Sequence, residues 1–263
     1  MRNKSLKLTY GLKDHKITPI SKVEGGLDCG CFCPVCGDSL IAKKGDVIRH
    51  HFAHQSKEPC EYGVETALHI AAKEFLATAK SFTIPEVKLR FPHSYKPDIL
   101  IHESMKIEID HVELEKHIDA LIPDVVVYSG GKKLFIEICV THPIDEKKLQ
   151  KIINLGISTI EIDLGGDKDF PDEQELARII LENDSRKKWK YNAVEEKMLQ
   201  QYKRNAEKMW IVNRGMSRHI DNCPLEKRVW NGKTYANVLD DCLNCDRLIE
   251  WKNMSDYILC MGR

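Results

Sequence analysis

The sequence predicts an α/β fold with a small metal-binding segment on each side of it. Two observations lead to this prediction. Between residues 122 and 164 a hairpin pattern, a helix pattern and a further strand pattern follow one another, and strand, helix, strand at this spacing is typical of a parallel crossover. Nine of the ten cysteines gather near the two ends of the chain, five before residue 61 and four after residue 222.

Composition limits the class of protein. The chain has 263 residues, of which 42% are hydrophobic and 30% charged, which suits one large domain or a core with small appendages. Lys and Arg together number 40, as do Asp and Glu, so a uniformly basic, histone-like DNA binder is excluded while a local basic patch is not.

The sequence also predicts where the protein works. No stretch of 18 apolar residues is present, and Met1 to Lys16 lack the apolar core of a signal peptide. We therefore expect a cytoplasmic protein without a membrane partner. In a reducing cytoplasm, ten cysteines indicate metal ligands before disulfides.

The first cysteine cluster has zinc-ligand spacing. Cys33 and Cys36 form a C-x2-C turn that is followed by Gly37, which lets two thiolates face one ion. Cys29 and Cys31 are either a pair behind the ligands or packing residues. The candidate ligands, four of which would hold zinc, are Cys33, Cys36, His51, His54 and Cys60. The simpler alternative is a reduced cysteine pair beside surface histidines.

The second cluster contains one C-x2-C turn with a single cysteine on either side. Such an arrangement can close a four-cysteine zinc site if a turn or strand brings in each flanking cysteine, giving a zinc-ribbon-like segment. Zinc would then supply folding energy to a segment too small for its own core. The alternative is four unconnected thiols. The ligands of this second zinc site would be Cys223, Cys242, Cys245 and Cys260.

The middle of the chain alternates helix and strand patterns. Residues 65–80 have helix-forming residues at helical spacing. On that helix Glu65, His69 and Lys73 share one face, which is either solvated or turned toward an active site. A Ser-Gly-Gly turn separates two of the strands, so these form a hairpin. The expected strands are 97–101, 106–110 with a possible continuation over 112–115, 122–128, 133–140 and 157–164, with a helix over 145–155.

Two acidic residues of the predicted hairpin stand out. Asp124 and Glu137 are 13 positions apart, so paired strands can bring their carboxylates to one end of the sheet. Carboxylates held together by apolar strands repel each other unless a cation lies between them, and Mg²⁺ or Mn²⁺ suits oxygen ligands. Such a site can activate water against a phosphodiester. In the simpler alternative, one carboxylate faces solvent and the other caps a turn.

An ordered set of motifs resembles a known family. The motifs are C-P-V-C-G at 33–37, H-H-F-A-H at 50–54, E-T-A-L-H at 65–69, I-P-D-V at 122–125 and I-E-I-C-V-T-H at 136–142. Together they are similar to the competence protein CoiA-like family, within the PD-(D/E)XK nuclease superfamily. The resemblance covers about residues 29 to 164, roughly half of the chain.

The resemblance implies a restriction-endonuclease-like core, a mixed sheet flanked by helices with a zinc finger before it. By motif position Asp124 and Glu137 would hold the catalytic metal, and Glu65 would add a further carboxylate. Cys139 stands where the motif has lysine, and a thiol is a poor substitute for an ammonium group. The missing cation could come from His142, Lys147 or Lys148. Otherwise the metal acts alone, or the site is inactive.

A weaker second match keeps the site assignment open. Asp98 follows a proline as Asp124 does, and Glu108-x-Asp110 follows it without the motif lysine. We rank this pair below Asp124 and Glu137 because its strands are shorter and more polar. Glu115 could lie at the edge of either site.

Two stretches in the second half of the chain carry opposite net charges. Residues 141–182 carry a net charge of −5 and residues 184–218 a net charge of +6. The basic stretch contains Trp189, Tyr191, Tyr202 and Trp210. Its cations could contact phosphates while its aromatic rings stack on unpaired bases, unless the rings belong to the core of an amphipathic helix.

These observations predict four regions. They are an N-terminal β and zinc-finger region (1–62), a nuclease core (63–182), a basic aromatic helix (183–220) and a four-cysteine zinc module (221–263). We expect a metal-dependent nuclease that acts on single- or double-stranded DNA. The main alternative is an inactive nuclease-like protein that binds DNA or a protein partner. A zinc-dependent or thiol redox enzyme using Cys29, Cys31 or Cys139 is a third possibility.

Overall fold

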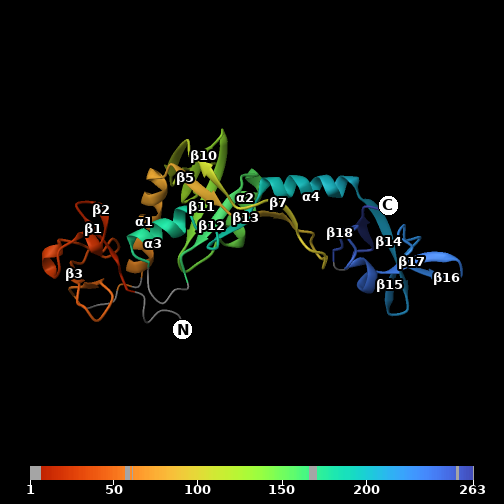
Figure 1. The fold of residues 1–263 in the computed structure, drawn as a ribbon, viewed down its shortest axis with the longest axis horizontal. Helices are drawn as coiled ribbons and strands as arrows, with labels where there is room; N and C mark the ends of the chain where they lie inside the picture. Colours follow the sequence, from red (N-terminus) through yellow and green to blue (C-terminus); the bar gives the residue numbers. More distant parts are fainter. Residues whose placement is uncertain (1–6, 57–59, 61, 166–170, 253–254, 263) are drawn as a thin grey trace. The chain divides into compact units, whose positions relative to one another are not determined.

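The computed structural model describes residues 7–56, 60, 62–165, 171–252 and 255–262. It divides the chain into two compact units. Unit 1 comprises residues 1–85 and 104–191, and unit 2 comprises residues 86–103 and 192–263. Both are mixtures of helices and sheets (Figure 1).

Unit 1 contains three of the longer helices. They are α1 (Gly63–Thr78), α2 (Glu146–Leu155) and α3 (Glu173–Leu181). Its strands are β1 (Tyr10–Lys13), β2 (Lys16–Pro19), β3 (Leu40–Lys43), β4 (His51–His54), β5 (Ser81–Ile84), β8 (Met105–Glu108), β9 (His111–Leu114), β10 (Val125–Ser129), β11 (Lys132–Cys139), β12 (Thr159–Asp163) and β13 (Lys187–Tyr191).

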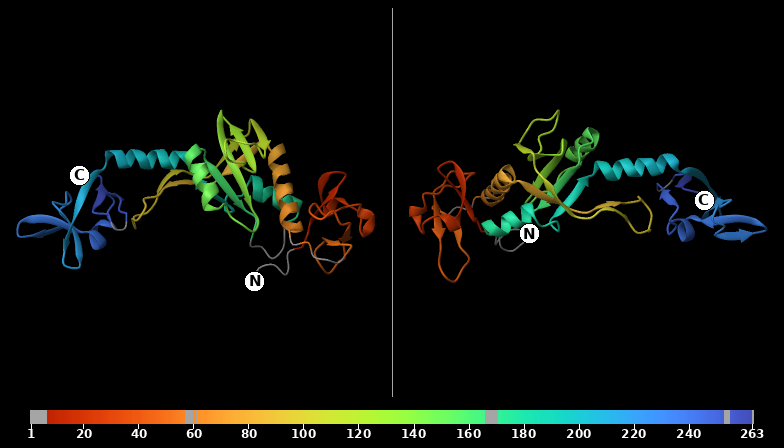
Figure 2. Two further views of the ribbon diagram at one scale, coloured as in Figure 1. Left: turned by 180° about the vertical axis from the view of Figure 1, so that it is seen from behind. Right: turned by 45° about the horizontal axis from the view of Figure 1, so that its top comes forward.

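A five-stranded mixed sheet forms the centre of unit 1. Its order is β13-β12-β11-β10-β9, in which β11 and β12 run parallel and the other pairs are antiparallel. The predicted hairpin, the helix α2 and the parallel crossover are thus confirmed. Helices α1 and α3 lie on one face of this sheet and α2 lies on the other (Figures 1 and 2).

The alternating orientation of the β10 side chains explains why helices cover both faces of the sheet. Val125 and Val127 pack with Leu68 and other α1 residues, whereas Val126 packs on the opposite face with Ile152 of α2. Because successive strand side chains point to opposite faces, an unbroken apolar run such as Val125–Val127 needs cover on both sides. Gly156 ends α2 in the left-handed region, with φ of 66°.

The N-terminal residues of unit 1 form two hairpins, β1–β2 and β3–β4. Cys29 and Cys31 are buried there in the same apolar cluster as Leu40 and Phe52. The Cys29 thiol donates to the carbonyl of Leu40 at 3.1 Å. Both cysteines therefore take part in packing.

Unit 2 is built on a six-stranded sheet of order β16-β17-β15-β14-β19-β18, with α4 (Ala193–Asn205) preceding it in the chain. The strands are β14 (Glu207–Arg214), β15 (Ser217–Asp221), β16 (Arg228–Trp230), β17 (Lys233–Asn237), β18 (Leu248–Glu250) and β19 (Tyr257–Cys260), besides the separate pair β6 (Val87–Leu89) and β7 (Ile99–His102).

The segment 183–220, which we expected to be one basic aromatic helix, divides into the helix α4, the strands β13 and β14, and most of β15. Trp189 lies in β13, Tyr202 in α4 and Trp210 in β14. The Asn192 side chain accepts hydrogen bonds from the N–H groups of residues 194 and 195, which fixes the start of the helix. The aromatic and β-branched residues outside 193–205 favour strands instead. Among the described helices, none combines the length and apolarity needed to cross a membrane.

A buried lysine makes the stability of unit 1 depend on pH. Lys187 is 4% exposed, and its Nζ donates to the Thr83 carbonyl at 2.7 Å and lies 3.9 Å from the centre of the Phe82 ring. Burial lowers the pKa of Lys187 to about 7. Because the unfolded lysine keeps a higher pKa, the unfolded chain binds more protons above pH 7, and stability rises with pH in that window.

We therefore expect the free energy of unfolding of the wild type, measured relative to that of Lys187→Met, to increase by about 2 kcal/mol from pH 7 to pH 9. Urea unfolding at the two pH values measures this difference. The adjacent exposed residue supplies a control, since Lys188→Met should show no such dependence. Parallel stability curves for wild type and Lys187→Met would contradict the expectation.

Candidate functional site

The two acidic residues singled out in the sequence lie at one end of the β10–β11 hairpin. Asp124 directly precedes β10, and Glu137 lies within β11. The Oδ2 atom of Asp124 accepts a hydrogen bond of 2.9 Å from the N–H of Ile138. This bond holds the Asp124 carboxylate against the strand that carries Glu137.

Helix α1 contributes two further groups. His69 Nε2 donates to Asp124 Oδ2 at 2.9 Å. Lys73 Nζ lies 3.5 Å from Asp124 Oδ1 and donates to Glu115 Oε1 at 2.7 Å. The α1 face that contains His69 and Lys73 is thus turned toward the carboxylates. Glu65 is one turn earlier on this helix and half-buried.

Helix α2 contributes Lys148 on the other side. Its Nζ lies 2.6 Å from Glu137 Oε2, while its backbone N–H donates to the capping residue Asp145 at 2.7 Å. The cap fixes the first turn of α2 and so directs this side chain. Of the two adjacent lysines considered from the sequence, Lys148 contacts the site, whereas Lys147 is exposed.

The two carboxylates differ in their proton affinity. Burial raises the pKa of Glu137 to about 7, and the charge of Asp124 adds to this effect. Burial also favours a higher pKa for Asp124. The hydrogen bonds from His69 and Ile138 and the charges of His69 and Lys73 outweigh burial, and they hold the pKa of Asp124 at about 2. Such uneven acidic pairs are common at functional sites.

The Oε1 atom of Glu137 shows how the pair could accept a cation. It is buried, and no hydrogen-bond partner for it exists among the residues that the structure describes. A buried carboxylate oxygen without a partner is costly. A divalent cation shared with Asp124 would remove that cost, because both residues offer the oxygen ligands that Mg²⁺ and Mn²⁺ prefer.

A further carboxylate lies beside this pair and was missed from the sequence. Glu161 of β12 is paired in parallel register with Glu137. Its oxygens accept from Lys190 Nζ at 3.1 Å and from the Ile144 N–H at 2.8 Å. The repeated Ile-Glu-Ile of residues 136–138 and 160–162, combined with the predicted crossover, is the signal that would have found it.

Two other candidates occupy different surroundings. Cys139 is buried in β11, and burial, with the neighbouring charges of Glu161 and Asp163, raises the pKa of its thiol to about 11. It is therefore a poor nucleophile. His142 is exposed, and its Nδ1 lies 2.7 Å from the hydroxyl of Thr141.

The residues of the second acidic motif belong to different units. Asp98 lies in unit 2, where its carboxylate is 3.5 Å from Arg90, whereas Glu108 and Asp110 lie in unit 1. Glu108 is exposed at the end of β8.

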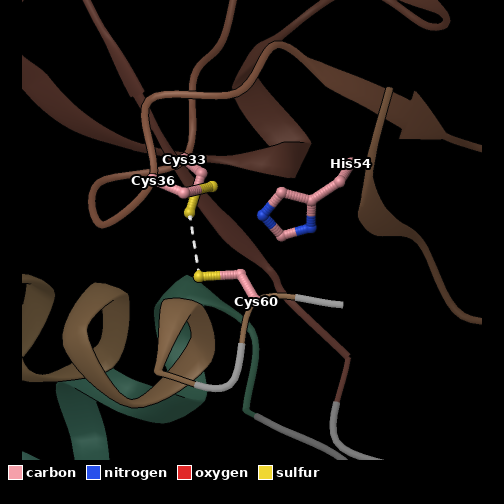
Figure 3. A group of neighbouring side chains, drawn as sticks. All are labelled: Cys33, Cys36, His54 and Cys60. Carbon is pink, nitrogen blue, oxygen red and sulfur yellow. Dashed lines mark hydrogen bonds between the residues drawn. The ribbon is translucent and has the colours of Figure 1, made fainter. Parts of the chain in front are cut away.

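A Cys/His cluster forms a separate candidate site in the N-terminal part of unit 1. The ligand atoms of Cys33, Cys36, His54 and Cys60 all lie within 4.8 Å of one another. Figure 3 shows the His54 ring facing the three thiols. The Sγ atoms of Cys33 and Cys60 are 3.9 Å apart, close to the spacing of about 3.8 Å that tetrahedral Zn–S bonds require. The cluster could hold zinc.

The surrounding backbone suits thiolate ligands. The N–H groups of Val35 and Cys36 point at the Cys33 sulfur, and the N–H of Asp38 points at the Cys36 sulfur and lowers its pKa. Gly37 adopts φ of +71°, which closes this turn. A Cβ on Gly63 would lie 3.2 Å from the Cys33 sulfur, so glycine permits the close approach of α1.

The structure also distinguishes the two candidate histidines. His54 Nε2 is buried with no hydrogen-bond partner in the described part of the chain, as expected of a metal-ligating atom. The Nδ1 atom of His51 instead lies 2.9 Å from the carbonyl of Arg49. His54 is thus better placed than His51 to bind zinc.

Comparison with known protein families gives a match near the N-terminus. Residues 21–63 match the family model described as competence protein CoiA, N-terminal domain. The matched segment includes all four residues of the Cys/His cluster, and it supports the CoiA-like family proposed from the motifs. No curated protein and no solved structure gave a match to this chain.

Proposed function

We propose that this CoiA-like chain is a divalent-metal-dependent nuclease of the PD-(D/E)XK superfamily that cleaves DNA. The observation that carries the proposal is the pairing of Asp124 with Glu137, whose buried Oε1 atom lacks a hydrogen-bond partner among the described residues. The mixed sheet with helices on both faces supports a restriction-endonuclease-like core.

Asp124 and Glu137 would hold Mg²⁺ or Mn²⁺. When bound, such an ion lowers the pKa of water and offsets the charge that develops on a phosphodiester. The side chains around the pair have separate tasks. The hydrogen bonds from His69 and Ile138 orient the Asp124 carboxylate, and together with the charge of Lys73 they keep it ionised.

Lys148 is our candidate for the cation that Cys139 cannot supply. The lysine reaches Glu137 from α2 rather than from β11, and it retains partial exposure to solvent, with 29% of its side chain accessible. An ammonium at this place can approach a phosphate oxygen while it contacts Glu137.

DNA is the substrate that the charge pattern and the family favour. The name of the matched family implies a role related to competence. In unit 2 Trp210 is 64% exposed, and Lys208 lies over the ring of the neighbouring Tyr257. Exposed aromatic and basic side chains suit contacts with bases and phosphates.

The direct experiment is a cleavage assay on single- and double-stranded DNA with Mg²⁺, Mn²⁺ or excess EDTA. We expect cleavage with either ion and none with EDTA. A preparation of the Asp124→Asn/Glu137→Gln double variant is the blank for contaminating nucleases. Cleavage that persists in EDTA, or that proceeds at the same rate in the wild type and the double variant, would contradict the proposal.

A second function is favoured by the lysines themselves. Lys73 and Lys148 already neutralise much of the charge of the two carboxylates, and a thiol occupies the motif lysine position. These features also fit a catalytically inactive, nuclease-like zinc protein that binds DNA or a protein partner. DNA binding without cleavage under any metal condition would favour this second function.

The role of Lys148 gives a separate prediction. Lys148→Met is expected to lower kcat by roughly 10²-fold, an increase in barrier of about 3 kcal/mol, because the transition-state charge loses its fixed cation. Lys147→Met, the adjacent exposed control, should retain wild-type kcat. Steady-state cleavage kinetics measure both. Equal kcat values for the two variants would remove Lys148 from the mechanism.

A further inference from the structure

Three distant segments of unit 2 bring four cysteines to one place. Cys223 follows β15, Cys242 ends the short helical turn Val238–Cys242, Cys245 comes three residues later, and Cys260 ends β19. All four line one cavity of about 20 Å³. Three of them are buried among the apolar residues of the unit 2 core, and none forms a disulfide.

The backbone around these cysteines has the turns of a metal-binding knuckle. The N–H of Cys245 donates to the Cys242 carbonyl at 2.9 Å, and the N–H of Leu248 donates to the Cys245 carbonyl at 3.0 Å. The N–H of Glu226 likewise donates to the Cys223 carbonyl at 3.0 Å. Each tight turn exposes a thiol toward the cavity that all four share.

One contact repeats a feature of the N-terminal cluster. The N–H of Gly262 points at the Cys260 sulfur, as the N–H of Asp38 points at the Cys36 sulfur. Gly262 has φ of +67°, which provides this geometry. The two clusters thus share a backbone N–H that is directed at a cysteine sulfur from two residues further along the chain.

From this convergence we propose that Cys223, Cys242, Cys245 and Cys260 form a second, structural zinc site in unit 2. Four thiolates are typical of a closed, tetrahedral zinc site. The cavity has room for little more than one water-sized body, which suits a single ion rather than an iron–sulfur cluster of several atoms.

The ion would also contribute to the folding of unit 2. In the described part of the chain, the N-terminal Cys/His cluster is the only group in which three or more ligand atoms of Cys, His, Asp or Glu lie within 4.8 Å of one another. The four C-terminal cysteines do not meet this criterion. The four C-terminal sulfurs must therefore move closer together when they bind zinc, and binding would tie β15, β19 and the Val238–Cys242 turn to one another.

The first test is the zinc content of the purified full-length chain. We expect two zinc ions per chain, one in Cys36→Ser and one in Cys242→Ser/Cys245→Ser, whereas the control Cys139→Ser should keep two. The proposal would be overturned if the wild type held one zinc ion per chain and Cys36→Ser held none. Iron in place of zinc, or disulfides between the C-terminal cysteines, would overturn it as well.

A second measurement avoids variants that disturb the core of unit 2. Co²⁺ is added to the metal-free Cys36→Ser chain, in which the N-terminal cluster lacks one ligand. We expect the intense thiolate-to-cobalt absorption and the visible bands of a tetrahedral four-thiolate site, at one equivalent of Co²⁺. Absence of these bands from a folded Cys36→Ser chain would overturn the proposal. Neither measurement depends on nuclease activity.

Discussion

Asp124→Asn is expected to reduce the rate of DNA cleavage by roughly 10³-fold or more, a barrier increase of about 4 kcal/mol. The amide oxygen can still accept from the Ile138 N–H and from His69, so the local fold is retained while the negative charge is lost. Without that charge the pair would hold a divalent cation poorly. Glu137→Gln should have an effect of similar size.

The measurement is kcat/KM in Mg²⁺ for both variants, with thermal unfolding as the check on folding. Glu108→Gln is the matched control, because Glu108 is an exposed carboxylate on β8, outside the central five-stranded sheet, and belongs to the second acidic motif. It should retain wild-type activity. Loss of cleavage in Glu108→Gln together with full activity in Asp124→Asn would move the site to the second motif.

His54→Ala is expected to release the N-terminal zinc ion and to destabilise unit 1. Zinc binding at such clusters is coupled to folding. Loss of one ligand from a four-ligand site is therefore expected to cost several kcal/mol, about the largest effect that single substitutions produce. Cys33 and Cys60 of the cluster pack in the apolar core that α1 shares with both N-terminal hairpins, so the loss should extend to the packing of α1.

His51→Ala is the matched control for this change. His51 and His54 lie at the two ends of the same short strand, but the structure places His54 alone of the two in the Cys/His cluster. Zinc content and urea unfolding of the two variants measure the difference. Retention of zinc by His54→Ala, with its loss from His51→Ala, would contradict the ligand assignment.

The parts of the fold that depend on local patterns were predictable from the sequence. An apolar run, a Gly-containing turn and a second apolar run specify the β10–β11 hairpin, and Asp145 and Gly156 mark the two ends of α2. These short-range signals also brought Asp124 and Glu137 together, because the register of a hairpin follows from its turn.

The rest of the site depends on long-range packing, which a single sequence does not encode in a local pattern. Lys73 and Glu115 are 42 positions apart and meet only because α1 lies against the sheet. Whether His51 or His54 is the zinc ligand depends on which face of β4 is turned toward Cys60. Trp189 and Trp210 belong to strands rather than to a helix because their partners, β12 and β19, are supplied by other parts of the chain.

The central claim is that Asp124 and Glu137 together bind a divalent cation, and its most direct test is Mn²⁺ binding measured by electron paramagnetic resonance. Titration of the zinc-loaded chain should remove the signal of free Mn²⁺ in proportion to the protein added. Asp124→Asn and Glu137→Gln should abolish this binding while zinc content stays unchanged, and Glu108→Gln should bind as the wild type does. Mn²⁺ binding that is identical in the wild type and both site variants would contradict the account.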